Sequence, residues 1–89
     1  MSEVHISSVM LYVAREDLAA IANKIKSLPG ADLVRVDANE GCLTTVFETE
    51  SLKQLRLIMS SLERLDGVAQ VSLLFHNIVQ PSAAQQISA

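Results

Sequence analysis

The spacing of hydrophobic residues changes along the chain, and each change marks an expected element. Apolar residues alternate from Val9 to Val13, which predicts a strand over residues 4–13 with two unlike faces. The acidic turn Arg15-Glu16-Asp17 then opens a helix, because carboxylates are favoured at its N-terminal end. From Leu18 to Leu28 apolar residues recur at helical spacing, and Pro29-Gly30 stops the helix.

The rest of the chain has patterns typical of three further strands and a second helix. Residues 31–38 and 42–48 read as two strands of a hairpin, and residues 68–76 read as a last strand. Between them, Ser51 and Gln54 have the spacing of a capping box, so we expect a second helix to begin at Ser51. The buried stripe of that helix is expected to contain Leu52, Leu55, Met59 and Leu62.

Two strand–helix–strand units in this order predict the ferredoxin-like fold, an α+β arrangement of the form βαββαβ. Right-handed crossovers would place both helices on one face of a four-stranded antiparallel sheet of strand order 4-1-3-2. We expect residues 1–77 to form this single domain. Residues 78–89 are small, polar and without period, and we expect a flexible tail there.

This arrangement would leave the other face of the sheet without a helix. We expect Leu43 and Phe47 to point toward the helices because of their size, together with Val71, Leu73 and Phe75 of the last strand. An uncovered face that mixes apolar and polar side chains can bind a ligand or a second copy of the chain. The side chains expected on the uncovered face are Ser8, Met10, Tyr12, Arg35, Val46, Ser72, Leu74 and His76.

Composition narrows the classes of partner. The 89 residues include 7 Lys and Arg against 10 Asp and Glu, a formal net charge of −3. A nucleic acid or an anionic membrane surface requires a basic patch, whereas an acidic protein attracts a cationic partner. We therefore expect neither nucleic-acid binding nor membrane insertion. With a single cysteine, Cys42, and no signal-peptide pattern at its start, the chain is expected to be cytoplasmic.

Motifs for catalysis and metal binding do not emerge from the sequence. The three glycines lie too far apart for a phosphate-binding loop, and no paired His or Cys spacing indicates zinc. We therefore predict a non-enzymatic protein without a cofactor or a metal. The acidic residues around the hairpin and the start of the second helix could instead pair with an arginine-bearing peptide.

Several segments of the chain together match the pattern of a known family. They are Ile6-Ser7-Ser8-Val9, Pro29-Gly30, Gly41, Glu48 and residues 67–76, which read GVAQVSLLFH. With these segments the chain resembles the NapD family, the chaperones of bacterial periplasmic nitrate reductase. The resemblance covers residues 4–77 and implies a cytoplasmic protein without catalytic residues. It also implies binding to the twin-arginine signal peptide of the nitrate reductase catalytic subunit, which delays export until the molybdenum cofactor is inserted.

A binding hypothesis follows from this resemblance and the uncovered sheet face. The signal peptide would lie on that face as an amphipathic helix, with Asp37 and Glu48 as counter-charges for its arginines. The free protein would be a monomer or a weak homodimer. Two alternatives stay open, namely a regulatory small-molecule-binding domain of the ACT type and a structural subunit that dimerises through its sheet.

Overall fold

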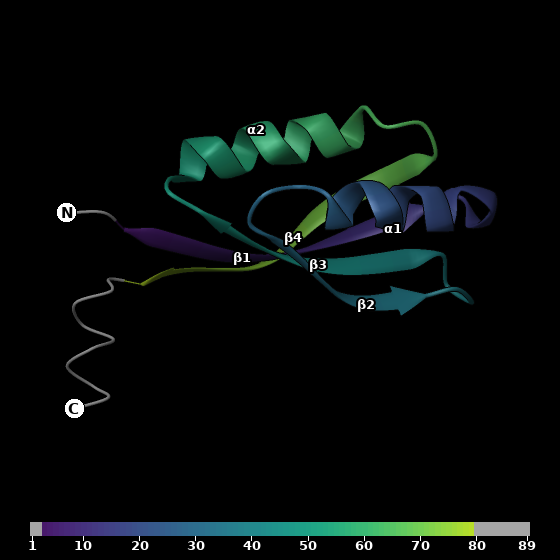
Figure 1. Cartoon of the computed structure of the whole chain (residues 1–89), viewed down its shortest axis with the longest axis horizontal. Helices are drawn as coiled ribbons and strands as arrows, with labels where there is room; N and C mark the ends of the chain where they lie inside the picture. The colour runs from purple at the N-terminus through teal and green to yellow at the C-terminus, as the bar shows by residue number, and fades with distance from the viewer. Residues whose placement is uncertain (1–2, 80–89) are drawn as a thin grey trace.

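The computed structural model describes residues 3–79, which form a four-stranded antiparallel sheet and two helices. The sheet order is β2-β3-β1-β4, the predicted order read from the opposite edge. Both helices lie on one side of the sheet (Figure 1), so the predicted ferredoxin-like α+β fold is confirmed. The elements are β1 (Val4–Val13), η1 (Arg15–Asp17), α1 (Leu18–Lys26), β2 (Ala31–Asp37), β3 (Cys42–Thr49), α2 (Leu52–Glu63) and β4 (Val68–Val79).

The core lies between the helices and the inner face of the sheet. Leu11 and Leu43 are cross-strand partners on β1 and β3, and neither has exposed surface. Phe47 is likewise fully buried, which confirms that Leu43 and Phe47 point toward the helices. The helices contribute Ile25 of α1 and Leu55 of α2 to the same cluster. Burial of these apolar side chains fixes which face of each strand is turned inward.

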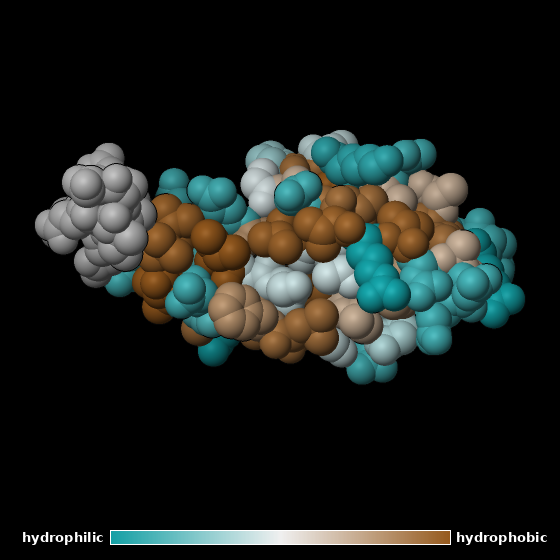
Figure 2. Space-filling view, turned by 90° about the horizontal axis from the view of Figure 1, so that it is seen from below, coloured by the Kyte–Doolittle hydropathy of each residue, from teal (hydrophilic) through white to brown (hydrophobic). Residues whose placement is uncertain are grey.

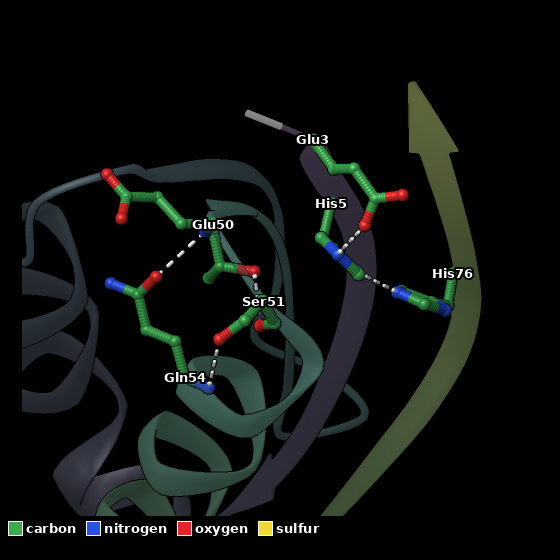
Figure 3. A network of polar contacts seen from close by, with 7 residues as sticks. Glu3, His5, Glu50, Ser51, Gln54 and His76 are labelled. Atoms are coloured by element: carbon green, nitrogen blue, oxygen red, sulfur yellow. Dashed lines mark hydrogen bonds and ion pairs between the residues drawn. The ribbon is translucent and has the colours of Figure 1, made fainter. Parts of the chain in front are cut away.

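The beginning of α2 follows the predicted capping pattern. The Gln54 backbone N–H donates to Ser51 Oγ at 3.1 Å, and Gln54 Oε1 accepts from the Glu50 backbone N–H at 2.8 Å (Figure 3). Ser51 is therefore the N-cap, as expected. The expectation that Leu52 is buried is wrong, because its side chain is 37% exposed at the first helical position. The expected helix opening at Arg15-Glu16-Asp17 is a 3-10 turn, and α1 begins at Leu18.

A bulge in β4 changes the predicted faces of that strand. Ser8 pairs with Phe75 but Val9 pairs with Leu73, so Leu74 is an extra residue without its own partner. The two residues after the bulge are therefore on the opposite faces from those expected. Phe75 shares the face of Ser8, and His76 shares the helix-side face of Ser7. The predictions that Phe75 points inward and that His76 lies on the uncovered face are wrong.

The edge strand β2 contains a second irregularity of this kind. Leu33 pairs with Thr45 and Arg35 pairs with Thr44, so Val34 is the extra residue. Leu33 consequently packs toward the core, whereas Arg35 lies on the uncovered face as predicted. In a regular strand, two-residue alternation would place Leu33 and Arg35 on the same face, but the bulge reverses the alternation between them.

The last strand is longer than expected. Ile78 and Val79 continue β4 and pair with His5 and Val4, so the ordered domain passes the predicted boundary at residue 77. The other residues of the predicted tail, 80–89, lie outside the described residues. We call the paired segments Val4–Ser8 of β1 and Phe75–Val79 of β4 the terminal ribbon. It lies at the end of the sheet where the N-terminus enters, and its tip extends past α2 (Figure 1).

Candidate binding surface on the uncovered sheet face

The side of the sheet away from the helices is hereafter called the open face. Residues directly opposite each other in a sheet point to the same side, so the register defines the members of this face. Figure 2 looks onto it and shows apolar side chains along much of its length, most densely at the terminal ribbon. The members that the register assigns are Val4, Ile6, Ser8, Met10 and Tyr12 of β1, Asp32, Arg35 and Asp37 of β2, Cys42, Thr44, Val46 and Glu48 of β3, and Gln70, Ser72, Phe75, Asn77 and Val79 of β4.

Most of the predicted binding residues come together in the middle of this face. Ser8 lies between Val46 of β3 and Phe75 of β4, which makes one row across three strands. Met10 lies in the next row, beside Ser72. Neighbouring side chains in such rows are in contact range, so the two rows form one continuous surface of mixed polarity.

Tyr12 and Arg35 lie at the margins of these two rows. Tyr12 is 38% exposed and is paired with Cys42 at the start of β3, so it lies in the next row toward the hairpin end. Arg35 on the edge strand β2 pairs with Thr44, the partner of Met10, and therefore ends the Met10 row. The Arg35 side chain is exposed, and its Nη2 atom is 3.5 Å from Asp37 Oδ2.

Sequence reasoning missed the most exposed aromatic side chain of the open face. Phe75 is 57% exposed, and the bulge residue Leu74 beside it is 52% exposed. A signal for this was present, because three large apolar residues in succession, Leu73-Leu74-Phe75, are incompatible with strict two-residue alternation. The apolar part of the surface consequently lies closer to the terminal ribbon than predicted.

His76, predicted to face the ligand, instead joins β4 to β1 on the helix side. Its Nε2 atom is 3.0 Å from Nδ1 of His5, and the His5 side chain is buried (Figure 3). The other ring nitrogen of His5 is 3.5 Å from Glu3 Oε1. One histidine nitrogen must donate its proton to the other, so this contact orders two rings behind the open face. The two histidines are 71 residues apart in the sequence, so no local spacing predicts this contact.

The two predicted counter-charges differ in their surroundings. Asp37 accepts hydrogen bonds from the backbone N–H groups of Asn39 and Glu40, both at 3.1 Å, and faces Arg35. Its carboxylate thus stabilises the hairpin turn. Glu48 is exposed at the end of β3 on the open face, opposite Ile6.

Two further carboxylates lie around the same cavity as Glu48. Glu50 belongs to the acidic residues that the sequence places at the start of the second helix, whereas Glu3 is distant from them in sequence. Glu3, Glu48 and Glu50 line a depression of about 470 Å³ together with Gly30 and Gln54. No Lys or Arg belongs to this lining. We call this depression the acidic cavity. Gly30 is required beside it, since its φ is +74° and a Cβ there would lie 2.6 Å from the Glu48 carbonyl oxygen.

Formal charge is divided between the two layers of the molecule. Arg35 is the only Lys or Arg in the four strands, and the other cations lie on η1, the helices and the turn after α2. Six of the ten acidic residues lie on the sheet and its connections, namely Glu3, Asp32, Asp37, Glu40, Glu48 and Glu50. The sheet layer is therefore acidic and favours a cationic ligand, whereas the helix layer carries a small excess of positive charge.

Within residues 3–79, His, Cys, Asp and Glu side chains form no group of three that could hold a metal ion. None of the helices over the same residues has the length and apolar character needed to cross a membrane.

A ferredoxin-like domain with an apolar open face and an acidic cavity at one end defines a small binding module. The model of one family, described as NapD protein, matches residues 4–79. The chain belongs to the NapD family, as the sequence resemblance predicted.

Individual relatives agree with this assignment. The proteins named Chaperone NapD from Escherichia coli K12 and from Shigella flexneri are each 28% identical over 71 residues, which is 80% of this chain and 82% of theirs. The solution structure of the E. coli Tat proofreading chaperone protein NapD superimposes with a TM-score of 0.76 at 26% identity, covering 88% of this chain and 82% of that one. The chain is thus a NapD-type chaperone in sequence and in fold.

Proposed function

We propose that this chaperone binds, in the cytoplasm, the twin-arginine signal peptide of the catalytic subunit of a periplasmic nitrate reductase. Holding the peptide would delay export of the precursor until its molybdenum cofactor is inserted. Membership of the NapD family supports the chaperone role, and the E. coli relative is described as a Tat proofreading chaperone. The protein acts here by binding, with no catalytic step.

The observation that carries the proposal is the continuity between the apolar rows and the acidic cavity. Glu48 belongs to the open face, two residues from Val46, and it also lines the cavity. A twin-arginine signal peptide joins a cationic segment directly to an apolar one. The apolar segment would lie over Met10, Val46 and Phe75, and the arginines would lie at the carboxylates of the acidic cavity.

Polar groups within the two rows would orient the bound peptide. The hydroxyl groups of Ser8 and Ser72 lie among the apolar side chains and can form hydrogen bonds with peptide side chains or with the ends of a peptide helix. Tyr12 would contact the far end of the peptide, and Arg35 would lie beside the peptide at the β2 edge of the Met10 row. Glu48, in the acidic cavity, replaces Asp37 as our principal counter-charge, because Asp37 is engaged by the hairpin turn and by Arg35. His76 would act as a positioning residue by ordering β4 behind Phe75.

The expected affinity is compatible with reversible holding. Burial of about 400–600 Å² of apolar surface contributes on the order of 10 kcal/mol at ~25 cal/mol/Å². Ordering a flexible peptide offsets several kcal/mol of that gain. The net value permits tight binding in the cytoplasm and release once the precursor is mature.

The test is the affinity of a synthetic twin-arginine signal peptide, measured by titration calorimetry on two variants. Met10→Asp combined with Phe75→Asp places two charges in the apolar rows, and we expect at least about 100-fold weaker binding, since each buried charge costs several kcal/mol. Val36→Asp is the matched control: Val36 is 50% exposed on the same sheet but pairs with Leu43 on the helix side. Thermal melts establish that both variants are folded. Unchanged affinity in the double variant would contradict the proposal.

The sheet-mediated dimer is distinguished in the same experiment. If two copies bind each other through the open face, peptide addition must dissociate them, and sedimentation velocity would record a fall from dimer to monomer. If the free protein is a monomer, as the proposal expects at micromolar concentration, the peptide leaves the assembly state unchanged. A stable dimer whose mass does not change with saturating peptide would place the dimer contact elsewhere.

A further inference from the structure

The sheet has two outer edges, and only one of them carries charged residues. β2 forms one edge, and three of its seven residues are charged, namely Asp32, Arg35 and Asp37. β4 forms the other edge, and none of its twelve residues is Lys, Arg, Asp, Glu or Pro. Charges and prolines on an edge strand oppose pairing with another chain. The β2 edge is therefore protected against such pairing by its side chains, whereas the β4 edge is not.

β4 presents both backbone and apolar groups at this edge. Among the described residues β4 pairs with β1 alone, so about half of its backbone N–H and C=O groups point outward from the sheet. Leu73 and Ile78 lie on the helix side and are 44% and 48% exposed, whereas Val9, the β1 partner of Leu73, is fully buried. A ligand on the open face would cover Phe75 and leave these two side chains exposed. A strand added beside β4 would cover both sides.

A second copy of β4 matches these faces when it lies antiparallel, with a twofold axis at Phe75. Residues opposite each other in a sheet must point to the same side. The bulge at Leu74 shifts the alternation in both copies alike, so the match holds before and after it. The two Phe75 rings would lie side by side at the axis, where an aromatic pair is favourable. The other pairs are Val71 with Ile78 and Leu73 with His76 on the helix side, and Ser72 with Asn77 on the open face.

α2 carries a charge pattern that is complementary to itself across the same axis. Glu63 lines a depression together with Val68, Gln70 and Val71, so this face of α2 is turned toward β4. Arg56 precedes Glu63 by seven residues, or two helical turns, and shares that face. Both side chains are exposed, and neither forms an ion pair within residues 3–79. An antiparallel second α2 would bring Arg56 of each copy toward Glu63 of the other, which favours a second copy over an unrelated strand.

We propose that β4 pairs edge to edge with β4 of a second copy and forms a transient homodimer. The four strands of each copy would join into one continuous sheet, with all helices on one side and both open faces on the other. One strand and one helix flank per copy make an interface of the small, transient class, so we expect a Kd on the order of 100 µM. The chain would be a monomer at micromolar concentration. This inference does not rest on the proposed peptide binding.

Nuclear Overhauser contacts in the full chain locate the interface. Val71 and Ile78 lie seven residues apart on one strand, which separates their methyl groups by about 20 Å within one copy. A contact between them can therefore arise only between copies. We expect it in a sample that mixes isotope-labelled and unlabelled chains at about 1 mM, and sedimentation equilibrium gives the Kd.

A lysine on each edge provides a matched pair of variants. Leu73→Lys places a charge inside the proposed contact, and we expect at least about tenfold weaker dimerisation. Val36→Lys is the control, because Val36 is 50% exposed on the helix side of the other edge strand, and it should leave the Kd unchanged. Thermal melts establish that both variants are folded. Signal-peptide affinity at micromolar protein should be unaffected by Leu73→Lys, so failure of the dimer is distinguishable from failure of peptide binding.

A charge exchange on α2 tests the twofold arrangement. Arg56→Glu and Glu63→Arg each place like charges opposite one another twice in the dimer, and each should weaken dimerisation about three- to tenfold. The variant that combines both changes keeps the net charge of the chain and should recover the original Kd. No recovery in the combined variant would contradict the placement of α2 beside its copy.

Three outcomes would overturn the inference as a whole. These are a monomer at about 1 mM protein, intermolecular contacts confined to residues of the two open faces, and equal weakening by Leu73→Lys and Val36→Lys. The second outcome would assign dimerisation to the open face, and the third would show a general effect of charge.

Discussion

The two halves of β1 have opposite polarity relative to the helices. From Val9 to Val13 the helix-side residues are apolar and buried, as expected for a strand over a core. In the terminal ribbon the helix-side positions hold His5 and Ser7, both buried, whereas Val4 and Ile6 lie on the open face. The strand therefore exchanges its apolar and polar faces halfway along its length.

β4 makes the same exchange at its bulge. Before Leu74, the helix side of the strand holds Val71 and Leu73. After it, Phe75, Asn77 and Val79 lie on the open face, and His76 and Ile78 lie on the helix side. Core packing explains the apolar positions of the central half. It does not explain why Val4, Ile6, Phe75 and Val79 of the ribbon lie on the open face while His5, Ser7 and His76 lie on the helix side. The peptide that we propose on the open face would explain this arrangement, and it would make the ribbon the part of the sheet that contributes most to binding.

The largest expected effect is a loss of folding stability in the central half of β1 that leaves peptide binding unchanged. Leu11→Ala removes a fully buried side chain of the central half and should cost about 2–5 kcal/mol of unfolding free energy, measured by urea denaturation. Ile6→Ala, on the open face of the ribbon, should cost about 1 kcal/mol because its side chain is only half-buried. Signal-peptide affinity, corrected for the folded fraction, should fall in Ile6→Ala alone. A greater loss of affinity in Leu11→Ala would remove the distinction between the two halves.

A smaller effect is expected from the histidine pair inside the ribbon. His76→Leu leaves the buried His5 nitrogen without its partner, which costs about 1–3 kcal/mol. Hydrogen exchange should accelerate at the amides of Val4–Ser8 before those of Val9–Val13, because the loss is local. Replacing both histidines by leucine should restore most of the stability, since no unpaired polar group remains. Additive losses in the double variant would show that the two rings are not coupled.

Local sequence patterns were sufficient to predict the architecture. They were not sufficient to predict which face of the sheet each strand residue occupies beyond the bulges. Helical spacing, the Ser51 cap and strand alternation predicted the element order, and with it the sheet order and the inward side of β3. The reversal at Leu74 depends on how β4 meets β1, residues some sixty positions earlier in the chain, and no glycine or proline marks it. The position of His76 followed from that reversal and was missed with it.

The candidate site was likewise only partly predictable from the sequence. Ser8, Met10, Val46 and Ser72 were found from alternation alone, because each lies in a regular part of the register. The acidic cavity was not predicted from the sequence, because it joins residues from the start of β1, the end of β3 and the beginning of α2. Proximity of that kind is a product of the tertiary fold and leaves no spacing in the sequence.

The smallest expected effect tests whether the acidic cavity belongs to the binding ribbon. Glu48→Gln keeps the size of the side chain and removes one charge, so signal-peptide affinity should fall about two- to fivefold, as for other exposed ion pairs. The dependence of affinity on salt should become shallower in this variant, because fewer charges are screened. Asp37→Asn is the matched change at the hairpin end of the sheet, where the carboxylate serves the turn. We expect it to alter thermal stability and to leave both the affinity and its salt dependence unchanged. If instead Asp37→Asn weakens binding and Glu48→Gln does not, the arginines lie at the hairpin end and the peptide runs in the opposite direction.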